Sequence, residues 1–393
     1  MTSFYIRLLH NINSQGFVIL TSIILLILGP SDGKAEEQPI LHIWEEQIPV
    51  MAHLAVSMNG TVLLFREHRD KGSIEVKRSE DGGKTWGEFI VVGKSVDLGA
   101  DMSDNGRYKG DHVGWSELAN VTVDERSGNI LVFAGGLKPA QILYRSKDHG
   151  KTWAQEKIIM KPDKNGWLAT TYCCDPGITV RNGKAKGRLL MPAQVFVGPV
   201  HKDGTRTYLN KGQGRNFFAK RYSNALYSDD GGRTWTPSEP FPLLGTSEPS
   251  LCELKNGHIY YNARTHVRRG NKQVGISEDF GESWKNAHED DELFDGPPDD
   301  YGCKGALVRV PGLDTDVLLY SSPGRKDKRE DITIKVSFDG AKSWPVRRMV
   351  RKGPGNYTWM AAGRPGTPSE GMIYLVSNKD WMARFILAWI LDD

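Results

Sequence analysis

Long runs of one charge are missing from this chain, and it has few cysteines. Its 393 residues carry 51 basic and 48 acidic side chains, a net charge of +3, and the basic residues do not gather into a run. The sequence therefore gives no sign of a nucleic-acid-binding surface. There are only four cysteines and none are spaced as Cys-x-x-Cys, which argues against a structural zinc site.

Long apolar runs are also scarce, and the clearest one lies near the N-terminus. Phe17–Leu28 is apolar but spans only about a dozen residues, which is short for a bilayer-spanning helix of roughly 20. A basic Arg7 precedes it and small residues up to Ala35 follow, the layout of a signal peptide. We expect 1–35 to be that peptide and 36–393 to be a secreted or periplasmic domain with no membrane span after cleavage. An uncleaved N-terminal anchor is the alternative.

The cysteines are expected to be mainly small buried residues. Cys173 and Cys174 are adjacent, and adjacent cysteines pair with each other only under strain. Export permits disulfides, so a bridge between Cys252 and Cys303 stays open as an alternative.

Glycine and tryptophan are abundant, at 43 and 11 residues, and five of the tryptophans close a repeated turn. The pattern Ser-x-Asp-x-Gly-x-x-Trp starts at Ser79, Ser146, Ser228, Ser277 and Ser337. In the last copy, alanine stands in place of the glycine. In such a turn the aspartate accepts backbone N–H groups, the glycine takes a positive φ and the tryptophan covers the hairpin. We assign these residues to the scaffold.

The repeat predicts the fold. Copies spaced by about 50–80 residues fit four-stranded blades with variable loops. A mature length of about 360 residues, at about 60 per blade, predicts an all-β, six-bladed β-propeller. One blade either lacks the motif or is closed by strands from both chain ends, and Met382–Ile390 is the predicted closing strand.

Three further segments carry a specific resemblance. Phe65–Arg69 reads Phe-x-Glu-x-Arg, Gly187–Ala193 reads Gly-Arg-Leu-x-x-Pro-Ala, and Thr246–Arg264 contains a glutamate followed by Asn-x-Arg. Together with the turns, they resemble the exo-α-sialidase (neuraminidase) family of glycoside hydrolases, which are propellers with these Asp-box turns. The resemblance implies release of terminal sialic acid from glycans by a retaining mechanism, with no metal or organic cofactor.

The same resemblance implies the site residues. Glu248 matches the catalytic glutamate, and Arg264 matches one of three arginines that bind the substrate carboxylate. Arg329 fits a second of these arginines, with Arg325 as a less well-spaced competitor. Tyr357, in a Gly-x-x-x-Tyr segment, matches the nucleophile.

These residue types suit a sugar with a carboxylate on its anomeric carbon. Guanidinium groups bind carboxylates through paired, charge-assisted hydrogen bonds. A carboxylate nucleophile would be repelled by that group, and sialidases use a tyrosine instead. A phenol with a reference pKa near 10 needs a base beside it, the role implied for Glu248.

The sequence departs from the family in two places. Gln47 stands where the first carboxylate-binding arginine is expected, and no Arg or Lys occurs between Glu36 and Phe65. His53 or Gln47 replaces that arginine at best in part. The loop that carries the general acid is short, and Asp70 is the only aspartate available there.

Two other functions therefore stay open. The first is a hydrolase or lyase acting on another acidic sugar, such as a uronic acid, with His53 or His112 near the pocket. The second is a non-catalytic propeller that binds a carbohydrate or a protein.

Overall fold

The computed structural model describes most of the chain from residue 40 onward. The described segments are 40–43 (backbone only), 52–68, 72–94, 118–135, 142–198, 220–267, 270–296, 302–377 and 381–392. The expected signal peptide and three residues singled out above, Gln47, Asp70 and His112, lie outside these segments.

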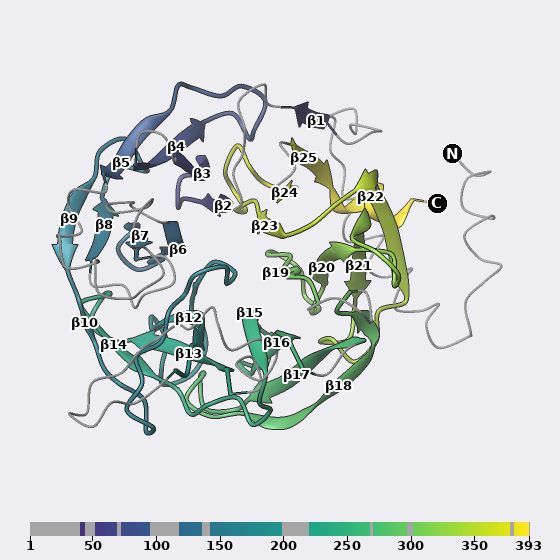
Figure 1. Cartoon of the computed structure of the whole chain (residues 1–393). Coiled ribbons are helices and arrows are strands. Elements are labelled where there is room, and N and C mark those ends of the chain that lie inside the picture. The colour runs from purple at the N-terminus through teal and green to yellow at the C-terminus, as the bar shows by residue number, and fades with distance from the viewer. Residues whose placement is uncertain are drawn as a thin grey trace.

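Six β-sheets surround a central axis, as Figure 1 shows. We number them blades 1 to 6 in chain order. Blade 3 has five strands in the described part of the chain and the others have four. The prediction of an all-β, six-bladed propeller is confirmed.

The strands of blades 1 to 3 follow one another along the chain. Blade 1 has β2 Ala52–Val56, β3 Val62–His68, β4 Ser73–Ser79 and β5 Ile90–Lys94. Blade 2 has β6 Leu118–Val123, β7 Ile130–Ala134, β8 Ile142–Ser146 and β9 Ala154–Lys157. Blade 3 has β10 Ile159–Met160, β11 Ile178–Thr179, β12 Leu189–Val195, β13 Tyr222–Ser228 and β14 Thr234–Pro237.

Blades 4 and 5 repeat the same four-stranded arrangement, and blade 6 joins the two ends of the chain. Blade 4 has β15 Thr246–Glu253, β16 Ile259–Thr265, β17 Asn271–Ser277 and β18 Lys285–Phe294. Blade 5 has β19 Ala306–Arg309, β20 Leu318–Pro323, β21 Glu330–Ser337 and β22 Val346–Pro354. Blade 6 has β23 Thr358–Ala362, β24 Met372–Ser377, β25 Trp381–Ile386 and β1 Ile40–Ile43.

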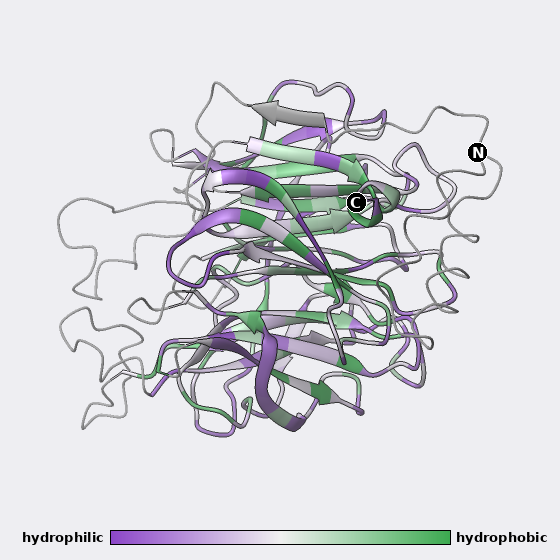
Figure 2. Cartoon of the chain, turned by 90° about the vertical axis from the view of Figure 1, so that its right-hand side faces the viewer, coloured by the Kyte–Doolittle hydropathy of each residue, from purple (hydrophilic) through white to green (hydrophobic). Residues whose placement is uncertain are grey.

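The apolar core lies between neighbouring blades. Phe65 and Val76 of blade 1 belong to one buried cluster with Val121 and Val132 of blade 2. Similar clusters join the other blades, and Figure 2 shows hydrophobic residues concentrated in the stacked strands. Both faces of the inner strands are therefore buried, which suits their Val-, Ile- and Leu-rich sequences, whereas the outermost strands β9, β18 and β22 are partly exposed.

The ring closes through its two chain ends. β1 pairs antiparallel with β25, with Ile40 opposite Arg384. The blade without the turn motif is thus completed by an N-terminal strand, one of the two arrangements that the sequence predicts.

The predicted closing strand Met382–Ile390 is too long. β25 ends at Ile386, where its pairing with β24 ends at Met372, and the helix α3 Leu387–Leu391 follows. Residues after Ile386 have no partner in β24, because Met372 is the first residue of that strand. They form α3 instead, which buries apolar side chains in the core. No helix in the described part of the chain is long and apolar enough to cross a membrane.

The five turns have the geometry that the sequence predicts. Each aspartate accepts two backbone N–H groups of its own turn, as Asp148 does from Lys151 at 3.1 Å and Thr152 at 2.9 Å. The turn glycine has a positive φ, 90° at Gly232, and Ala341 adopts 69° in the fifth copy. The first serine adds a bond that sequence reasoning missed, because its hydroxyl accepts the N–H of the glycine position.

These turns lie on one face of the ring, and the innermost strands begin on the other face. In blade 4, Thr246 pairs with Thr265 at one end, and Glu253, Ile259 and Ser277 are aligned at the other. The turn motif that starts at Ser277 is therefore on the far face from the start of β15.

A disulfide between Cys252 and Cys303 is not formed. Both residues, as well as Cys173 and Cys174, are buried free thiols. Cys252 belongs to β15, whereas Cys303 lies beside Asn356, whose Oδ1 is 3.5 Å from its Sγ. The expectation of small buried residues is confirmed.

Removing one turn aspartate is expected to destabilise the fold. Asp148→Ala leaves two backbone N–H groups and the hydroxyls of Thr152 and Ser146 without their acceptor. Most of these groups are exposed to water, so the free energy of unfolding should fall by about 0.5–1.5 kcal/mol. Burial raises the pKa of Asp148, but these hydrogen bonds together lower it to about 2. The difference from the parent protein should therefore be complete above the ordinary aspartate pKa and disappear as the pH falls through about 2.

Chemical denaturation at several pH values measures this difference. Asp327→Ala is the matched control, because Asp327 is exposed and its carboxylate pairs with exposed Arg325. It should leave stability almost unchanged, because an exposed ion pair contributes little. Equal losses in the two variants would contradict the structural role of the turn.

Candidate active site

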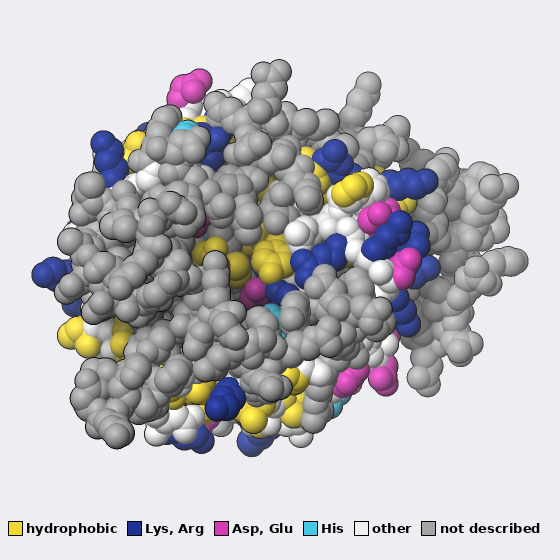
Figure 3. Space-filling model, viewed as in Figure 1, with side chains coloured by type: hydrophobic (Ala, Val, Ile, Leu, Met, Phe, Trp, Pro, Cys, Tyr) yellow, Lys and Arg dark blue, Asp and Glu magenta, His cyan; other side chains and the backbone are white. Residues whose placement is uncertain are grey.

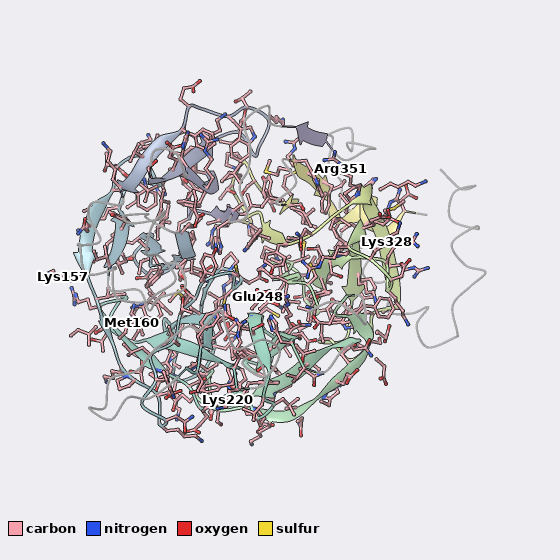
Figure 4. All side chains as sticks on the ribbon, in the orientation of Figure 1. Lys157, Met160, Lys220, Glu248, Lys328 and Arg351 are labelled. Atoms are coloured by element: carbon pink, nitrogen blue, oxygen red, sulfur yellow. The ribbon has the colours of Figure 1, made fainter. Side chains whose placement is uncertain are left out.

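Glu248 lies near the axis, on β15, the innermost strand of blade 4. Figure 4 labels it close to the middle of the ring, with Lys157 and Arg351 at the rim. A register shift between Ser247 and Ser250 interrupts the pairing with β16, and Glu248 adopts a φ of 43°. A non-glycine residue in this left-handed region is strained, and such strain persists only where the surroundings hold it.

Arg264 joins Glu248 to Tyr357. Pairing of Ser247 with Arg264 places the arginine on the neighbouring strand, and its Nη1 donates to Glu248 Oε2. The same nitrogen donates to the Tyr357 hydroxyl at 2.6 Å, and that hydroxyl donates to Glu248 Oε1 at 3.1 Å. Tyr357 directly precedes β23, the innermost strand of blade 6, so the triangle connects two blades that are not neighbours.

Arg329 faces the same tyrosine from blade 5. Its guanidinium carbon lies 6.0 Å from the centre of the Tyr357 ring, and its Nη1 donates to Asn356 Oδ1 at 3.0 Å. The competitor Arg325 is exposed and pairs with Asp327. The structure therefore brings Arg329, and not Arg325, to the site.

The charges of the site oppose one another. Burial alone would raise the pKa of Glu248, but the charge and hydrogen bond of Arg264, the charge of Arg221 and the Tyr357 hydroxyl lower it overall. Burial raises the pKa of Tyr357 well above its ordinary value, against the influence of Arg264 and with that of Glu248. At neutral pH the pair is thus a carboxylate beside a neutral phenol.

Sequence reasoning missed three buried polar residues at this site. Arg221 directly precedes β13, and Gln194 lies on β12. His266 directly follows β16, and its Nδ1 lies 2.9 Å from the Ser247 hydroxyl. The one signal that the sequence offered was an arginine, Arg221, which directly precedes the first residue of β13.

His53 cannot replace a guanidinium. It lies on β2, is fully buried and stands 5.6 Å from Trp359, ring centre to ring centre. Burial and the charge of Lys304 lower its pKa well below the ordinary value, so it is neutral at neutral pH. A neutral imidazole has one N–H donor and no charge, so His53 does not supply the charge-assisted pair of hydrogen bonds of the missing arginine.

A buried ion pair ties the inner strands together beside the site. Lys304 Nζ donates to Asp175 Oδ1 at 2.5 Å and to the Thr358 carbonyl at 2.6 Å. Asp175 Oδ2 also accepts the Leu307 N–H at 2.8 Å, and its backbone N–H donates to the Pro249 carbonyl. The pair thus connects the chain segment before β11 with blades 4, 5 and 6.

The face seen in Figure 1 presents mixed chemistry at its centre. Figure 3 shows hydrophobic, acidic, basic and histidine side chains exposed close together there. Among the described residues, no group of three or more His, Cys, Asp or Glu side chains is arranged to hold a metal ion. Of the residues predicted for the site, Glu248, Arg264, Arg329 and Tyr357 converge, and Asp70 lies outside the described segments.

Known proteins share this sequence pattern. The family of BNR repeat-like domains matches residues 112–375. A sialidase from Micromonospora viridifaciens is 28% identical over 366 residues, which cover 86% of this chain and 51% of the relative. A sialidase from Bacteroides fragilis (strain YCH46) is 27% identical over 329 residues, 77% of this chain and 52% of the relative. The chain spans about half the length of these curated relatives.

Solved structures share the fold. The Hadza microbial sialidase Hz136 superposes with a TM-score of 0.64 at 24% identity, over 87% of this chain and 66% of that one. An intramolecular trans-sialidase from Ruminococcus gnavus superposes with a TM-score of 0.61 at 16% identity, over 91% of this chain and 96% of that one. At these identities the likeness is one of fold.

Proposed function

Because this chain belongs to the family of BNR repeat-like domains, we propose that it is a glycoside hydrolase that releases terminal sialic acid from glycans. One observation carries the proposal. A buried arginine, Arg264, donates to both a carboxylate and a phenol, Glu248 and Tyr357, near the axis of the ring. Relatives named sialidase support the same reaction class.

The polar groups of this site suit a sugar with a carboxylate on its anomeric carbon. Arg264 and Arg329 supply two guanidinium groups, whose carbons lie 5.7 and 6.0 Å from the centre of the Tyr357 ring. Guanidinium groups bind carboxylates with paired hydrogen bonds. Since Tyr357 is neutral, it approaches such a sugar without the repulsion that a carboxylate nucleophile would meet.

In the first step, the Tyr357 oxygen forms a bond to the anomeric carbon while its proton passes to Glu248 Oε1, 3.1 Å away. The bond from that carbon to the leaving oxygen breaks, and a general acid protonates this oxygen. Asp70 remains the candidate for that acid. Arg264 lies beside the phenol oxygen and stabilises the negative charge that develops there.

In the second step, water attacks the anomeric carbon and transfers a proton to the ionised acid. The bond to Tyr357 breaks, and the tyrosine oxygen recovers its proton from Glu248. Two displacements at the same carbon leave its configuration unchanged, so the proposed enzyme is a retaining one.

A second acidic sugar is a specific competitor. No Arg or Lys occurs between Glu36 and Phe65, and the buried His53 is neutral. The arginine expected at Gln47 is therefore absent from the sequence, which leaves another acidic sugar, such as a uronic acid, as the alternative substrate. A panel of fluorogenic glycosides decides between them: we expect release of the dye from an α-sialoside and none from a β-glucuronide. Turnover of the glucuronide alone would overturn the proposal.

Tyr357→Phe is expected to lower kcat on the sialoside by at least about 100-fold, because the variant lacks the attacking oxygen. Tyr227→Phe is the matched control. Its ring packs under Arg188 beside the turn at Ser228, away from the site, and its activity should be unchanged. A binding protein without catalysis predicts no turnover by any of the three proteins and sialoside binding that is indifferent to the change at Tyr357.

Arg329→Met is expected to lower kcat/KM for the sialoside roughly 10- to 150-fold, the effect of losing one charged hydrogen bond of about 1.5–3 kcal/mol. Arg325→Met removes an arginine four residues earlier that pairs with Asp327 at the surface, and it should leave kcat/KM unchanged. Steady-state kinetics on both variants measure the difference. A larger loss in Arg325→Met would reverse the assignment of the two arginines.

A further inference from the structure

Arg221 is a buried cation beside the Glu248 and Tyr357 pair, and it comes from blade 3. Its side chain is nearly inaccessible, and its guanidinium carbon lies 4.1 Å from the centre of the Phe196 ring. Its Nη2 donates to Gln194 Oε1 at 2.5 Å, so this hydrogen bond is to a neutral amide.

Gln194 connects that arginine to the backbone of Glu248. The amide oxygen that accepts from Arg221 also accepts the Glu248 N–H at 3.3 Å. The amide nitrogen donates to the Tyr172 carbonyl at 2.5 Å, which fixes the orientation of the side chain. Glu248 has a strained φ of 43°, and the hydrogen bond to Gln194 stabilises its backbone in that conformation.

The charge of Arg221 also acts on the glutamate. Burial lowers the pKa of Arg221 to about 10, an effect that Glu248 opposes and Arg264 reinforces. The arginine is still protonated at neutral pH. Among the described residues, the cations that act most strongly on Glu248 are Arg264 and Arg221. Glu248 also interacts with Tyr357, Cys173, Cys174 and Cys303.

Arg264 has two tasks if the proposed function is correct. It donates to Glu248 and Tyr357 in the free protein, and it faces the substrate carboxylate when the sugar is bound. A second anion on Arg264 weakens its hold on the first. Glu248 then needs another positive charge to remain ionised and ready to accept the tyrosine proton.

We propose that Arg221, held by Gln194, is a positioning residue that keeps Glu248 ionised and in its strained conformation while Arg264 binds the substrate carboxylate. This inference rests on the proposed function. It assigns to blade 3 a part in the reaction that the spacing of the sialidase motifs does not reveal.

The acidic limb of the pH–rate profile tests this role. Loss of a neighbouring cation raises the pKa of a carboxylate, and the reaction requires Glu248 ionised. In Arg221→Gln, the acidic limb of kcat/KM on the fluorogenic sialoside should therefore move to higher pH by about one unit or more. Arg221→Lys keeps the charge and should keep the limb within a few tenths of a unit of the parent protein. Arg221→Met repeats the neutral substitution if the glutamine variant does not fold.

Two outcomes would overturn the inference. Equal losses of kcat in the lysine and glutamine variants with an unmoved acidic limb would make Arg221 a packing residue. A rise in KM with an unmoved limb would make it a substrate ligand.

A measurement without turnover separates this inference from the proposed function. Carbon-13 NMR of glutamate carboxyl groups follows the titration of Glu248, whose signal is identified by its loss in Glu248→Gln. Its midpoint should rise by about one unit in Arg221→Gln and not in Arg221→Lys. An inactive parent protein would defeat the sialidase proposal, whereas an unmoved midpoint would defeat the role of Arg221.

Discussion

The buried pair of Lys304 and Asp175 is the constraint on which the site depends. A charge pair removed from water gains little net stability, because desolvation offsets its attraction, but it fixes geometry where every hydrogen bond is satisfied. Here each partner also bonds to backbone groups, so inner strands from opposite parts of the ring are held at one point. Two of those backbone groups belong to Pro249 and Thr358, next in sequence to Glu248 and Tyr357.

That adjacency explains how a precise triangle forms between strands distant in sequence. Glu248 and Tyr357 are 109 residues apart, and no hydrogen-bonded sheet contains both. The distance between them depends on the Lys304–Asp175 ion pair and on the packing of blades 4, 5 and 6. The strain at Glu248 fits this picture, because a left-handed glutamate persists only in a backbone that its neighbours hold in place.

The sequence predicted what depends on local contacts. Each turn is closed by hydrogen bonds within a few residues, so its motif was sufficient to identify it. The resemblance to the sialidase motif implies Arg264, and the β15–β16 hairpin places it beside Glu248. Arg221 is not implied, because its link to Glu248 runs through Gln194 and so depends on the pairing of β12 with β13 and on the backbone of β15. The end of the closing strand was also misplaced, since hydrophobicity alone does not distinguish β25 from α3.

The five repeated turns and the site differ in redundancy. Five near-identical turns share the same task on one face of the ring, and Ala341 shows that an imperfect copy is tolerated. The triangle of Glu248, Arg264 and Tyr357 has a single instance of each group. Single substitutions therefore affect the turns and the triangle differently. One substitution in the triangle removes the proposed activity, whereas one in a turn leaves the fold in place. We therefore expect evolution to produce propellers that keep this fold but have lost catalytic activity.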